Sequence, residues 1–336
     1  MLRVYDHLPG GLLELGPDQL HQALPGPALI HLPGRRVAPL FVSVLLHGNE
    51  ATGWLAAREV LRKYARSGPP RALSLFIGNI TAARQGLRAL DGQSDYNRIW
   101  PGGMDSDRPE FLMARQVVDT MRERGVFASI DIHNNTGLNP HYGCINRLDA
   151  DWLHLATLFS RTVVYFTQPR GVQSAAFAQL CPAVTLECGK PGTAQGVEHA
   201  ASYMDACLHL SEFPAHPVHA QDIDLFHTIA TVKVPENVRF SFGEAGCEIE
   251  FPSDLDHLNF RELQPGAQLA HIHGGHEVRL QALDDAGKEV GSLLFDCSDG
   301  KIRLRRPLMP AMLTRDARVI RQDCLCYLME RLPLPA

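Results

Sequence analysis

The stretch PLFVSVLLHGNEATGWLAAREVLRKYARSG (residues 39–68) decides the fold. Its first eight residues form a continuous apolar run, which is typical of a buried strand. From Glu50 the apolar residues recur at helical spacing, basic residues gather near the end, and Gly68 is followed by two prolines, as expected where a helix stops. A buried strand that leads directly into a helix predicts an α/β fold.

The same alternation continues outward from this stretch, from residue 28 to residue 212. It predicts further strands over 72–80, 127–133 and 182–189, and helices over 110–125, 151–160 and 195–213. Alternating strands and helices form a mostly parallel or mixed sheet flanked by helices. We therefore expect residues 1–212 to be one α/β domain.

The composition changes beyond residue 212. FPAHPVHAQD (213–222) reads as a linker, and short apolar runs separated by Gly, Pro and Asp turns follow it. These runs predict strands over 225–235, 247–251, 276–283, 291–297 and 301–307. Residues 213–336 are accordingly expected to form a smaller antiparallel β domain.

Charge and cysteine content limit the partners and the compartment. The net charge of −5 gives no basic footprint for nucleic acid or an anionic membrane surface. No signal peptide and no apolar window of roughly 18 residues is present, so we expect a cytoplasmic protein with a small-molecule partner. The eight cysteines include no C-x-x-C pair, which favours reduced, buried thiols. We interpret Cys188 as a packing residue, because no base partner for a nucleophile can be named. Whether the chain forms homo-oligomers is left open by the sequence.

Polar residues follow four of the predicted strands: His47 with Glu50, Asn79, His133, and Glu187. In a parallel sheet such strand ends lie along one edge, where ligands bind. An H-x-x-E spacing alone is a weak signal, because 16 histidines give about one such match by chance. A surface turn that opens a helix is the alternative interpretation of His47 and Glu50.

A hydrolytic zinc site needs three His or Glu ligands, an open position for water and a further carboxylate that moves protons. His47, Glu50 and His133 are candidate ligands, and Glu187 is a candidate general base. For Glu187 the alternative is a solvated strand-end residue. Asp131, two residues before His133, is either an outer partner of a ligand imidazole or an ordinary ion-pair residue.

The segment 78–103 has the composition of a ligand-binding loop. It carries Arg84, Arg88 and Arg98 with Asn79 and Asn97 among glycines. An arginine fork binds a carboxylate or polarises a carbonyl that is gaining charge. A solvated basic loop is the alternative.

Five motifs in order carry a resemblance to a known family: HGNE (47–50), GNITAARQGLR (78–88), DYNRIWPG (95–102), DIHNNTG (131–137) and PAVTLECG (182–189). Together they resemble the succinylglutamate desuccinylase/aspartoacylase family of the zinc carboxypeptidase superfamily. The chain departs from the family pattern at Ile80, where proline is usual, and in a longer interval between Arg88 and Asn97.

The resemblance implies one zinc ion per chain, held by His47, Glu50 and His133, with Glu187 as the catalytic carboxylate. It implies that Arg88, Asn97 and Arg98 bind the substrate. It also implies that the C-terminal domain caps the cleft. We expect Arg88 also to stabilise the oxyanion that forms when water attacks.

The activity that follows is removal of an acyl group from an N-acyl amino acid or a related small amine. An acidic acyl group would call for a further basic contact, for which Arg170 is the candidate. A carboxypeptidase acting on peptides and a catalytically inactive metal-binding module are the alternatives. Histidines 271, 273 and 276 could form a second metal cluster, but an exposed hairpin is favoured.

Overall fold

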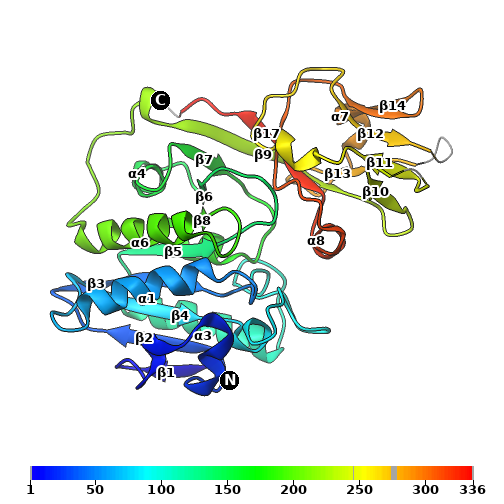
Figure 1. Ribbon diagram of the computed structural model, residues 1–336. Helices are drawn as coiled ribbons and strands as arrows, with labels where there is room; N and C mark the ends of the chain where they lie inside the picture. The colour runs from blue at the N-terminus through cyan, green and yellow to red at the C-terminus, as the bar shows by residue number, and fades with distance from the viewer. Residues whose placement is uncertain (1, 245, 274–277, 335–336) are drawn as a thin grey trace. The chain divides into compact units, whose positions relative to one another are not determined.

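The structure is a computed structural model that describes residues 2–244, 246–273 and 278–334. The chain divides into two compact units (Figure 1). Unit 1 contains residues 2–134 and 141–224, and unit 2 contains residues 135–140 and 225–334. Each unit is described by itself below.

Unit 1 is built on a mixed sheet with the order β1-β2-β4-β3-β5-β8-β6-β7. Its strands are β1 (Arg3–Tyr5), β2 (Ala28–Leu32), β3 (Arg36–Val44), β4 (Arg71–Ile77), β5 (Ala128–His133), β6 (Tyr142–Ile145), β7 (Thr162–Tyr165) and β8 (Ala183–Glu187). The central neighbours β4, β3, β5 and β8 are parallel, whereas β2 runs antiparallel to β4 and β6 antiparallel to β8. The predicted α/β class with a mostly parallel, mixed sheet is confirmed.

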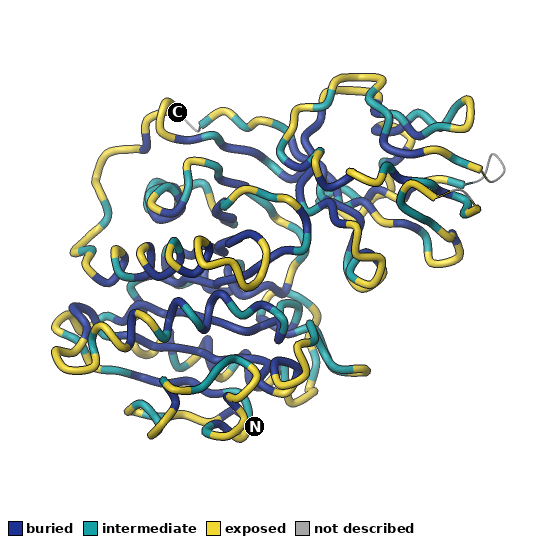
Figure 2. Tube along the Cα trace, viewed as in Figure 1, coloured by how far each residue is buried: buried dark blue, intermediate teal, exposed yellow. Residues whose placement is uncertain are grey.

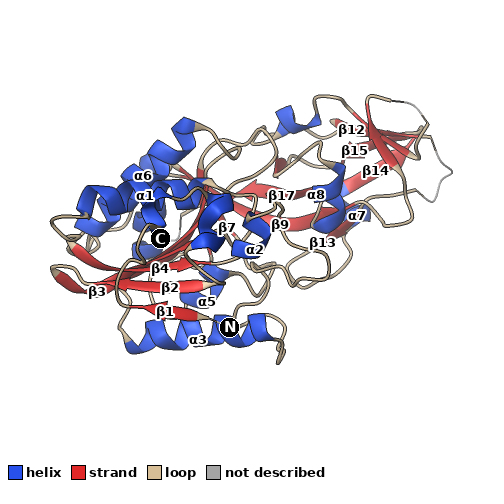
Figure 3. Ribbon diagram, turned by 60° about the horizontal axis from the view of Figure 1, so that its bottom comes forward, coloured by secondary structure: helices blue, strands red, loops and turns tan. Residues whose placement is uncertain are grey.

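Helices cover both faces of this sheet. They are α1 (Thr52–Tyr64), α2 (Ile80–Ala83), α3 (Pro109–Glu123), α4 (Ala150–Thr157), α5 (Gln173–Phe177) and α6 (Ala194–His209), with short 3₁₀ turns at Leu12–Glu14, Pro17–Gln22 and Ala220–Asp222. Helices α1 and α6 lie on one face, and α3 and α5 lie on the other (Figure 3). Among the described residues, no helix is both long and apolar enough to cross a membrane.

The two faces are packed differently. On the α3 and α5 face, the rings of Phe41 and Phe177 stack with centroids 4.2 Å apart. On the α1 face, Gly53 lies so close to the sheet that a Cβ there would be 3.0 Å from Val44 and 3.1 Å from Ile132. The strands between these layers are buried (Figure 2). This packing fixes the start of α1 directly above the ends of β3 and β5.

Helix α1 begins at Thr52 rather than at Glu50, so His47 and Glu50 lie in a tight turn. The Glu50 N–H donates to the His47 carbonyl at 3.1 Å. The chain leaves β3 through Leu45, whose φ of 56° is left-handed and whose carbonyl accepts the Asn79 N–H. Gly48 then passes so close to α2 that a Cβ would be 2.2 Å from the Ala83 nitrogen. Only glycine fits at that position.

Unit 2 is β-rich and holds two groups of strands. One has the order β13-β9-β17-β16, and the other has the order β10-β11-β12-β15-β14. The strands are β9 (Asp224–Lys233), β10 (Phe240–Phe242), β11 (Ile249–Phe251), β12 (Gln268–Ile272), β13 (Gln281–Leu283), β14 (Phe295–Ser298), β15 (Lys301–Leu304), β16 (Met309–Ala311) and β17 (Cys326–Arg331). The paired strands are antiparallel except β10 with β11, which confirms the predicted β-rich C-terminal region.

The prediction of a strand over 291–297 is wrong for the first four of these residues. The residues form a short helix, α7 (Gly291–Leu294), and only then enter β14. The Glu289 carboxylate accepts the N–H groups of Ala282 and Gly291 at 3.1 and 3.0 Å, which turns the chain before the strand can begin. The other helical segments of unit 2 are a 3₁₀ turn at Leu255–Leu258 and α8 (Ala317–Gln322).

The histidines at 271 and 273 are exposed on β12 and just beyond it. His273 Nε2 lies 2.6 Å from Glu250 Oε2, and His271 Nε2 lies 2.8 Å from the Gln268 amide. The first two residues of the strand predicted over 276–283, which include His276, lie outside the described residues, and of the other six only Gln281–Leu283 form a strand, β13. Within the described part, His271 and His273 belong to no group of three metal-ligand side chains.

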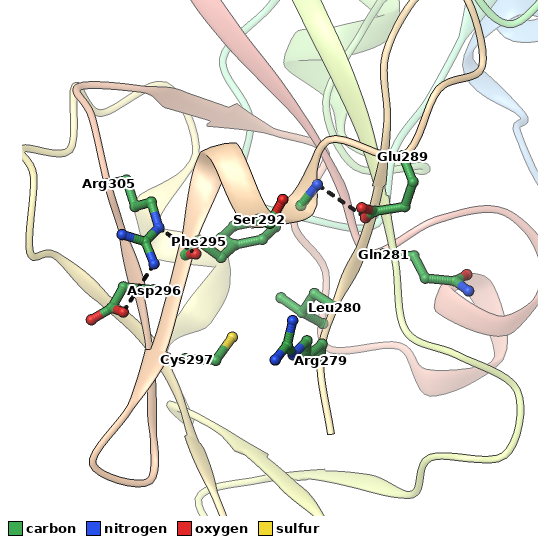
Figure 4. A pocket seen from close by; sticks show the side chains of 10 residues that line it. Arg279, Leu280, Gln281, Glu289, Ser292, Phe295, Asp296, Cys297 and Arg305 are labelled. Carbon is green, nitrogen blue, oxygen red and sulfur yellow. Dashed lines mark hydrogen bonds and ion pairs between the residues drawn. The ribbon is translucent and has the colours of Figure 1, made fainter. Parts of the chain in front are cut away.

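A cavity of about 290 Å³ opens in unit 2 beside α7 (Figure 4). Arg279, Cys297 and Phe295 contribute to its wall. The Arg305 guanidinium at its edge donates to the Phe295 carbonyl at 2.8 Å and to Asp296 Oδ1 at 3.2 Å, so this arginine holds the start of β14. None of the candidate site residues predicted from the sequence lines this cavity.

Acidification should destabilise unit 1 through His31. The His31 imidazole is buried in β2, and its Nδ1 lies 2.8 Å from Ser74 Oγ. Burial, assisted by the charge of Arg124, lowers the pKa of His31 to about 4. The unfolded chain therefore binds a proton between the usual pKa of 6.5 and about 4 that the folded chain does not bind, and the free energy of unfolding should fall across this window by at most about 1.4 kcal/mol per pH unit.

Urea unfolding at pH 7 and pH 5 measures this effect. His31→Gln keeps a hydrogen-bonding group for Ser74 but cannot titrate, so its stability should depend less on pH than that of the wild type. An equal pH dependence in both proteins would show that His31 is not the responsible group.

Candidate metal centre

His47, Glu50 and His133 come together at the carboxyl edge of the central strands. One ligand atom from each lies within 4.8 Å of the others, and all three side chains are buried. His47 Nδ1 is 2.8 Å from Glu50 Oε1, and His133 Nδ1 is 2.7 Å from Glu50 Oε2. The turn after β3 supplies the first two residues and the end of β5 supplies the third, because β3 and β5 are parallel neighbours.

The outer nitrogen of each imidazole meets a carboxylate. His47 Nε2 lies 3.0 Å from Asp95 Oδ1, and His133 Nε2 lies 2.8 Å from Asp131 Oδ2. Asp131 is held in turn by the Ser43 hydroxyl, which donates to its Oδ1 at 2.6 Å. A carboxylate that accepts the Nε2 proton leaves Nδ1, the nitrogen beside Glu50, as the atom that can ligate a metal, which is the usual arrangement around a ligand histidine.

The two imidazole nitrogens and the carboxylate oxygen are buried, and each imidazole Nε2 already has an aspartate partner. Together these three ligand atoms could hold one metal ion. This donor set is typical of zinc. Burial by itself would lower the pKa of His133, but Asp131 and Glu50 outweigh burial and raise that pKa well above its usual value. The two histidines likewise hold the pKa of Glu50 below its usual value despite burial. Within the described residues this is the one such group.

Glu187 ends β8 beside this group. It pairs in register with His133 across the parallel β5–β8 ladder, and 8% of its surface is exposed. Gly189, with a φ of 69°, turns the chain away directly afterwards. Between them Cys188 is fully buried; burial, together with the charges of Glu187 and Glu50, raises the pKa of its thiol well above the usual value. A thiolate is therefore disfavoured, which agrees with a packing role for Cys188.

Arg88 faces the metal-ligand group despite the longer interval that follows it. Its Nη2 donates to Asp95 Oδ2 at 3.2 Å, and its Nη1 lies 4.0 Å from Glu50 Oε1. The Arg88 carbonyl accepts the N–H of Gly48 at 3.1 Å, so the arginine is fixed to the HGNE turn. This position allows the guanidinium to interact with a group bound beside Glu50.

Asn97 and Arg98 lie on the loop that carries Asp95. The Asn97 N–H donates to Asp95 Oδ1 at 2.7 Å, and the Asn97 side-chain oxygen accepts the N–H of Gln173 at 3.3 Å. The Arg98 guanidinium donates to the Asn97 carbonyl at 2.8 Å and is half-buried. Burial alone would raise the pKa of Asp95, but His47 and then the charges of Arg88 and Arg98 outweigh burial and hold this pKa well below its usual value. Both residues thus interact with Asp95, the carboxylate that meets His47.

Arg170 is exposed on the loop before α5. This loop packs on the loop of Arg98: a Cβ on Gly171 would be 2.6 Å from the Arg98 carbonyl oxygen, and the Gly171 carbonyl accepts the Trp100 N–H at 3.0 Å. These contacts of Gly171 place the backbone of the Arg170 loop against the Arg98 loop, and Arg170 itself is exposed. Asn79, by contrast, is a helix cap, because its Oδ1 accepts the Ala82 N–H at 3.1 Å.

Two residues of this centre received no role from the sequence, Asp95 and Asn134. Asp95 orients His47, and the Asn134 N–H donates to Glu50 Oε2 at 3.1 Å. Each stands inside a motif, DYNR and DIHNNTG, so its position was visible. The contact partner of each lies more than 45 residues away in the chain, and no spacing rule connects them.

Solved structures show which fold this is. The succinylglutamate desuccinylase from Chromobacterium violaceum matches with a TM-score of 0.58 and 17% identity, covering 90% of this chain and 87% of that one. Murine aminoacylase 3 matches with a TM-score of 0.55 and 14% identity, covering 88% and 96%. The product-bound ectoine utilization protein EutE (DoeB) from Ruegeria pomeroyi matches with a TM-score of 0.54 and 16% identity, covering 91% and 84%. The chain has the fold of these proteins.

The sequence places the chain more closely. The model of the succinylglutamate desuccinylase/aspartoacylase catalytic domain matches residues 38–209, just over half of the chain. The chain belongs to the succinylglutamate desuccinylase/aspartoacylase family, which takes its name from two deacylating hydrolases. No curated protein matches the chain in sequence.

Proposed function

We propose that the chain is a zinc-dependent amidohydrolase that removes an acyl group from an N-acyl amino acid or a related small amine. The observation that carries the proposal is the buried His47–Glu50–His133 group with Glu187 in register beside it. Family membership supports it, because a deacylating hydrolase of this family needs such a site. We assign this activity to residues 1–212 and propose a cytoplasmic location. The capping role of residues 213–336 stays a prediction.

A zinc ion bound by these three residues would supply a Lewis acid and would lower the pKa of a water ligand to about 7. Glu187 would accept the proton of the attacking water and deliver it to the leaving amine. Asp95 and Asp131 would keep the two imidazoles in the tautomer that leaves Nδ1 free to ligate.

The arginines would act on the substrate. Arg88, which lies 4.0 Å from Glu50, would stabilise the oxygen that gains negative charge when water adds to the amide carbonyl. Asn97 and Arg98 would bind the substrate carboxylate, so that binding away from the scissile bond orients the amide. Arg170 is the candidate for a second carboxylate on an acidic acyl group.

Hydrolysis assays with zinc-loaded protein test the proposal. The panel contains N-acetyl, N-succinyl and N-formyl amino acids, and a set of dipeptides with free carboxyl ends is measured beside it. Turnover of acylated amino acids above that of the dipeptides supports deacylation. Preferred hydrolysis of the dipeptides would instead identify a carboxypeptidase, and no turnover at full zinc loading would indicate an inactive metal-binding module.

Arg98→Ala should weaken the use of substrates that carry a free α-carboxylate. Losing a hydrogen-bonded charge partner costs on the order of 1.5–3 kcal/mol, or roughly 10- to 150-fold in kcat/KM. The same substrate with its carboxyl group amidated should be affected much less, because it offers no charge for the guanidinium. Steady-state kinetics on both substrates, with wild-type and variant protein, measures the difference.

The matched control is Arg84→Ala, which removes an exposed arginine from the same segment. This variant should have the wild-type kcat/KM on both substrates. Equal losses on the acid and the amide in Arg98→Ala, accompanied by a lower melting temperature, would assign Arg98 to the structure of the loop rather than to substrate binding.

A further inference from the structure

Asn134 joins three separate segments at the metal-ligand group. It directly follows β5, and only 3% of its surface is exposed. Its backbone N–H donates to Glu50 Oε2 at 3.1 Å. Its side-chain oxygen accepts the N–H of Thr52 at 3.2 Å, and its side-chain nitrogen donates to the Gly189 carbonyl at 2.9 Å. One residue thus contacts the turn of the ligand Glu50, the first residue of α1 and the turn after Glu187.

The bond to Thr52 replaces a missing helix cap. Ala51 is the N-cap of α1 and has no side chain that can accept a hydrogen bond from the first turn. The first N–H groups of a helix have no partner within the helix, so a buried helix start needs an external acceptor. Asn134 Oδ1 is that acceptor for Thr52. It therefore fixes the start of α1 against the end of β5, with Glu50 only two residues before the fixed point.

The bond to Gly189 acts on the other side of the centre. Gly189 is left-handed, with a φ of 69°, and stands two residues after Glu187. The N–H of Cys188 donates to the His133 carbonyl at 3.0 Å, so the β5–β8 ladder extends one step beyond Glu187. The hydrogen bond from the Asn134 amide to the Gly189 carbonyl adds a further connection between the two strands, beyond the bond of Cys188. It holds the backbone that follows Glu187 at a set distance from the backbone that follows His133.

We propose that Asn134 is a positioning residue that couples the ligand Glu50 to the general base Glu187 through its two side-chain hydrogen bonds. The oxygen arm, to Thr52, sets Glu50 for the metal. The nitrogen arm, to Gly189, sets Glu187 for the attacking water. The second half rests on the proposed function, whereas the first half requires only that the group binds zinc.

Two substitutions separate the arms. Asn134→Ala removes both side-chain bonds and leaves the backbone N–H to Glu50. Asn134→Asp keeps the shape and the acceptor for Thr52, but an ionised aspartate has no hydrogen to donate to the Gly189 carbonyl. The matched control is Asn146→Ala, which removes a side-chain bond of 3.0 Å to the Phe166 carbonyl just beyond β6, at the end of the β6–β8 ladder away from Glu187.

Zinc affinity, measured by competition with a chromogenic chelator, and steady-state kinetics on the best substrate of the panel are the two readouts. Changing an outer residue that orients a metal ligand typically lowers metal affinity or activity 10- to 100-fold, and the Asn134 side chain orients Glu50 through Thr52. We expect Asn134→Ala to lose 10- to 100-fold in zinc affinity and at least 10-fold in kcat at full zinc loading. We expect Asn134→Asp to bind zinc within about threefold of the wild type and to lose kcat with KM nearly unchanged.

Unchanged zinc affinity and kcat in Asn134→Ala would overturn the inference, as would losses no larger than those of Asn146→Ala. Wild-type kcat in Asn134→Asp would overturn the nitrogen arm. If Asn134→Ala does not fold, Asn134→Asp decides both arms: wild-type kcat overturns the nitrogen arm, and zinc affinity more than about threefold below the wild type, although the acceptor for Thr52 is retained, overturns the oxygen arm. A wild-type protein that hydrolyses nothing would defeat the proposed function, while the zinc affinities would still test the oxygen arm.

Discussion

Replacing Glu187 with glutamine is expected to lower kcat by roughly 10²- to 10⁴-fold while the fold and zinc binding are retained, because an amide cannot accept the proton of the attacking water. Glutamine has the same shape as glutamate, and Glu187 is not one of the three residues proposed to hold the metal. Zinc content, circular dichroism and steady-state kinetics of the purified variant measure the three quantities. The KM should change little, because the carboxylate acts on the water rather than on the substrate.

Glu59→Gln is the matched control, since it makes the same chemical change at an exposed position of α1. It should leave kcat unchanged. A Glu187→Gln protein with normal zinc content that kept more than a third of wild-type turnover would exclude Glu187 as the general base and direct attention to another carboxylate of the centre.

Loss of the metal is expected to abolish turnover and to lower stability together. A ligand that binds only the folded state stabilises it by about 2.7 kcal/mol at 100 times its Kd. Zinc should therefore raise the melting temperature of chelator-treated wild-type protein and restore its activity. His133→Gln should show neither response, because it removes one of three protein ligands.

His271→Gln, which changes an exposed histidine of unit 2, should respond to zinc like the wild type. Anomalous scattering at the zinc edge then locates the ion directly. A peak at residues 271–276 without one at His47 would refute the assignment, and so would a full thermal response to zinc in His133→Gln.

The β3–α1 stretch and the parallel central strands were predictable because each depends on local periodicity. The side chains at the strand ends were predictable as a group for the same reason, since the topology of a parallel sheet brings them to one edge. What periodicity could not reveal was the turn at His47. The helix starts two residues later than its pattern indicates, because the chain must bend at Leu45 and pass Gly48 across α2.

Side-chain to backbone hydrogen bonds explain the other differences. Glu289 binds the N–H groups of Ala282 and Gly291 and so creates α7 inside an apolar run that reads as a strand. Asp95 and Asn134 contact partners far away in the chain, and no local pattern indicates these contacts. Residues 135–140 belong to unit 2, although unit 1 surrounds them in the sequence. The predicted single boundary after residue 212 could not include such an excursion of the chain.

The backbone at Leu45 restricts how this sequence can vary. Leu45 is fully buried at the end of a strand, a location where valine and isoleucine are otherwise favoured. Its φ of 56° is least accessible to side chains branched at Cβ. Natural variants of this chain should therefore carry glycine, asparagine or a residue that is not branched at Cβ at position 45, and should avoid valine and isoleucine, although valine occupies positions 42 and 44 of the same strand.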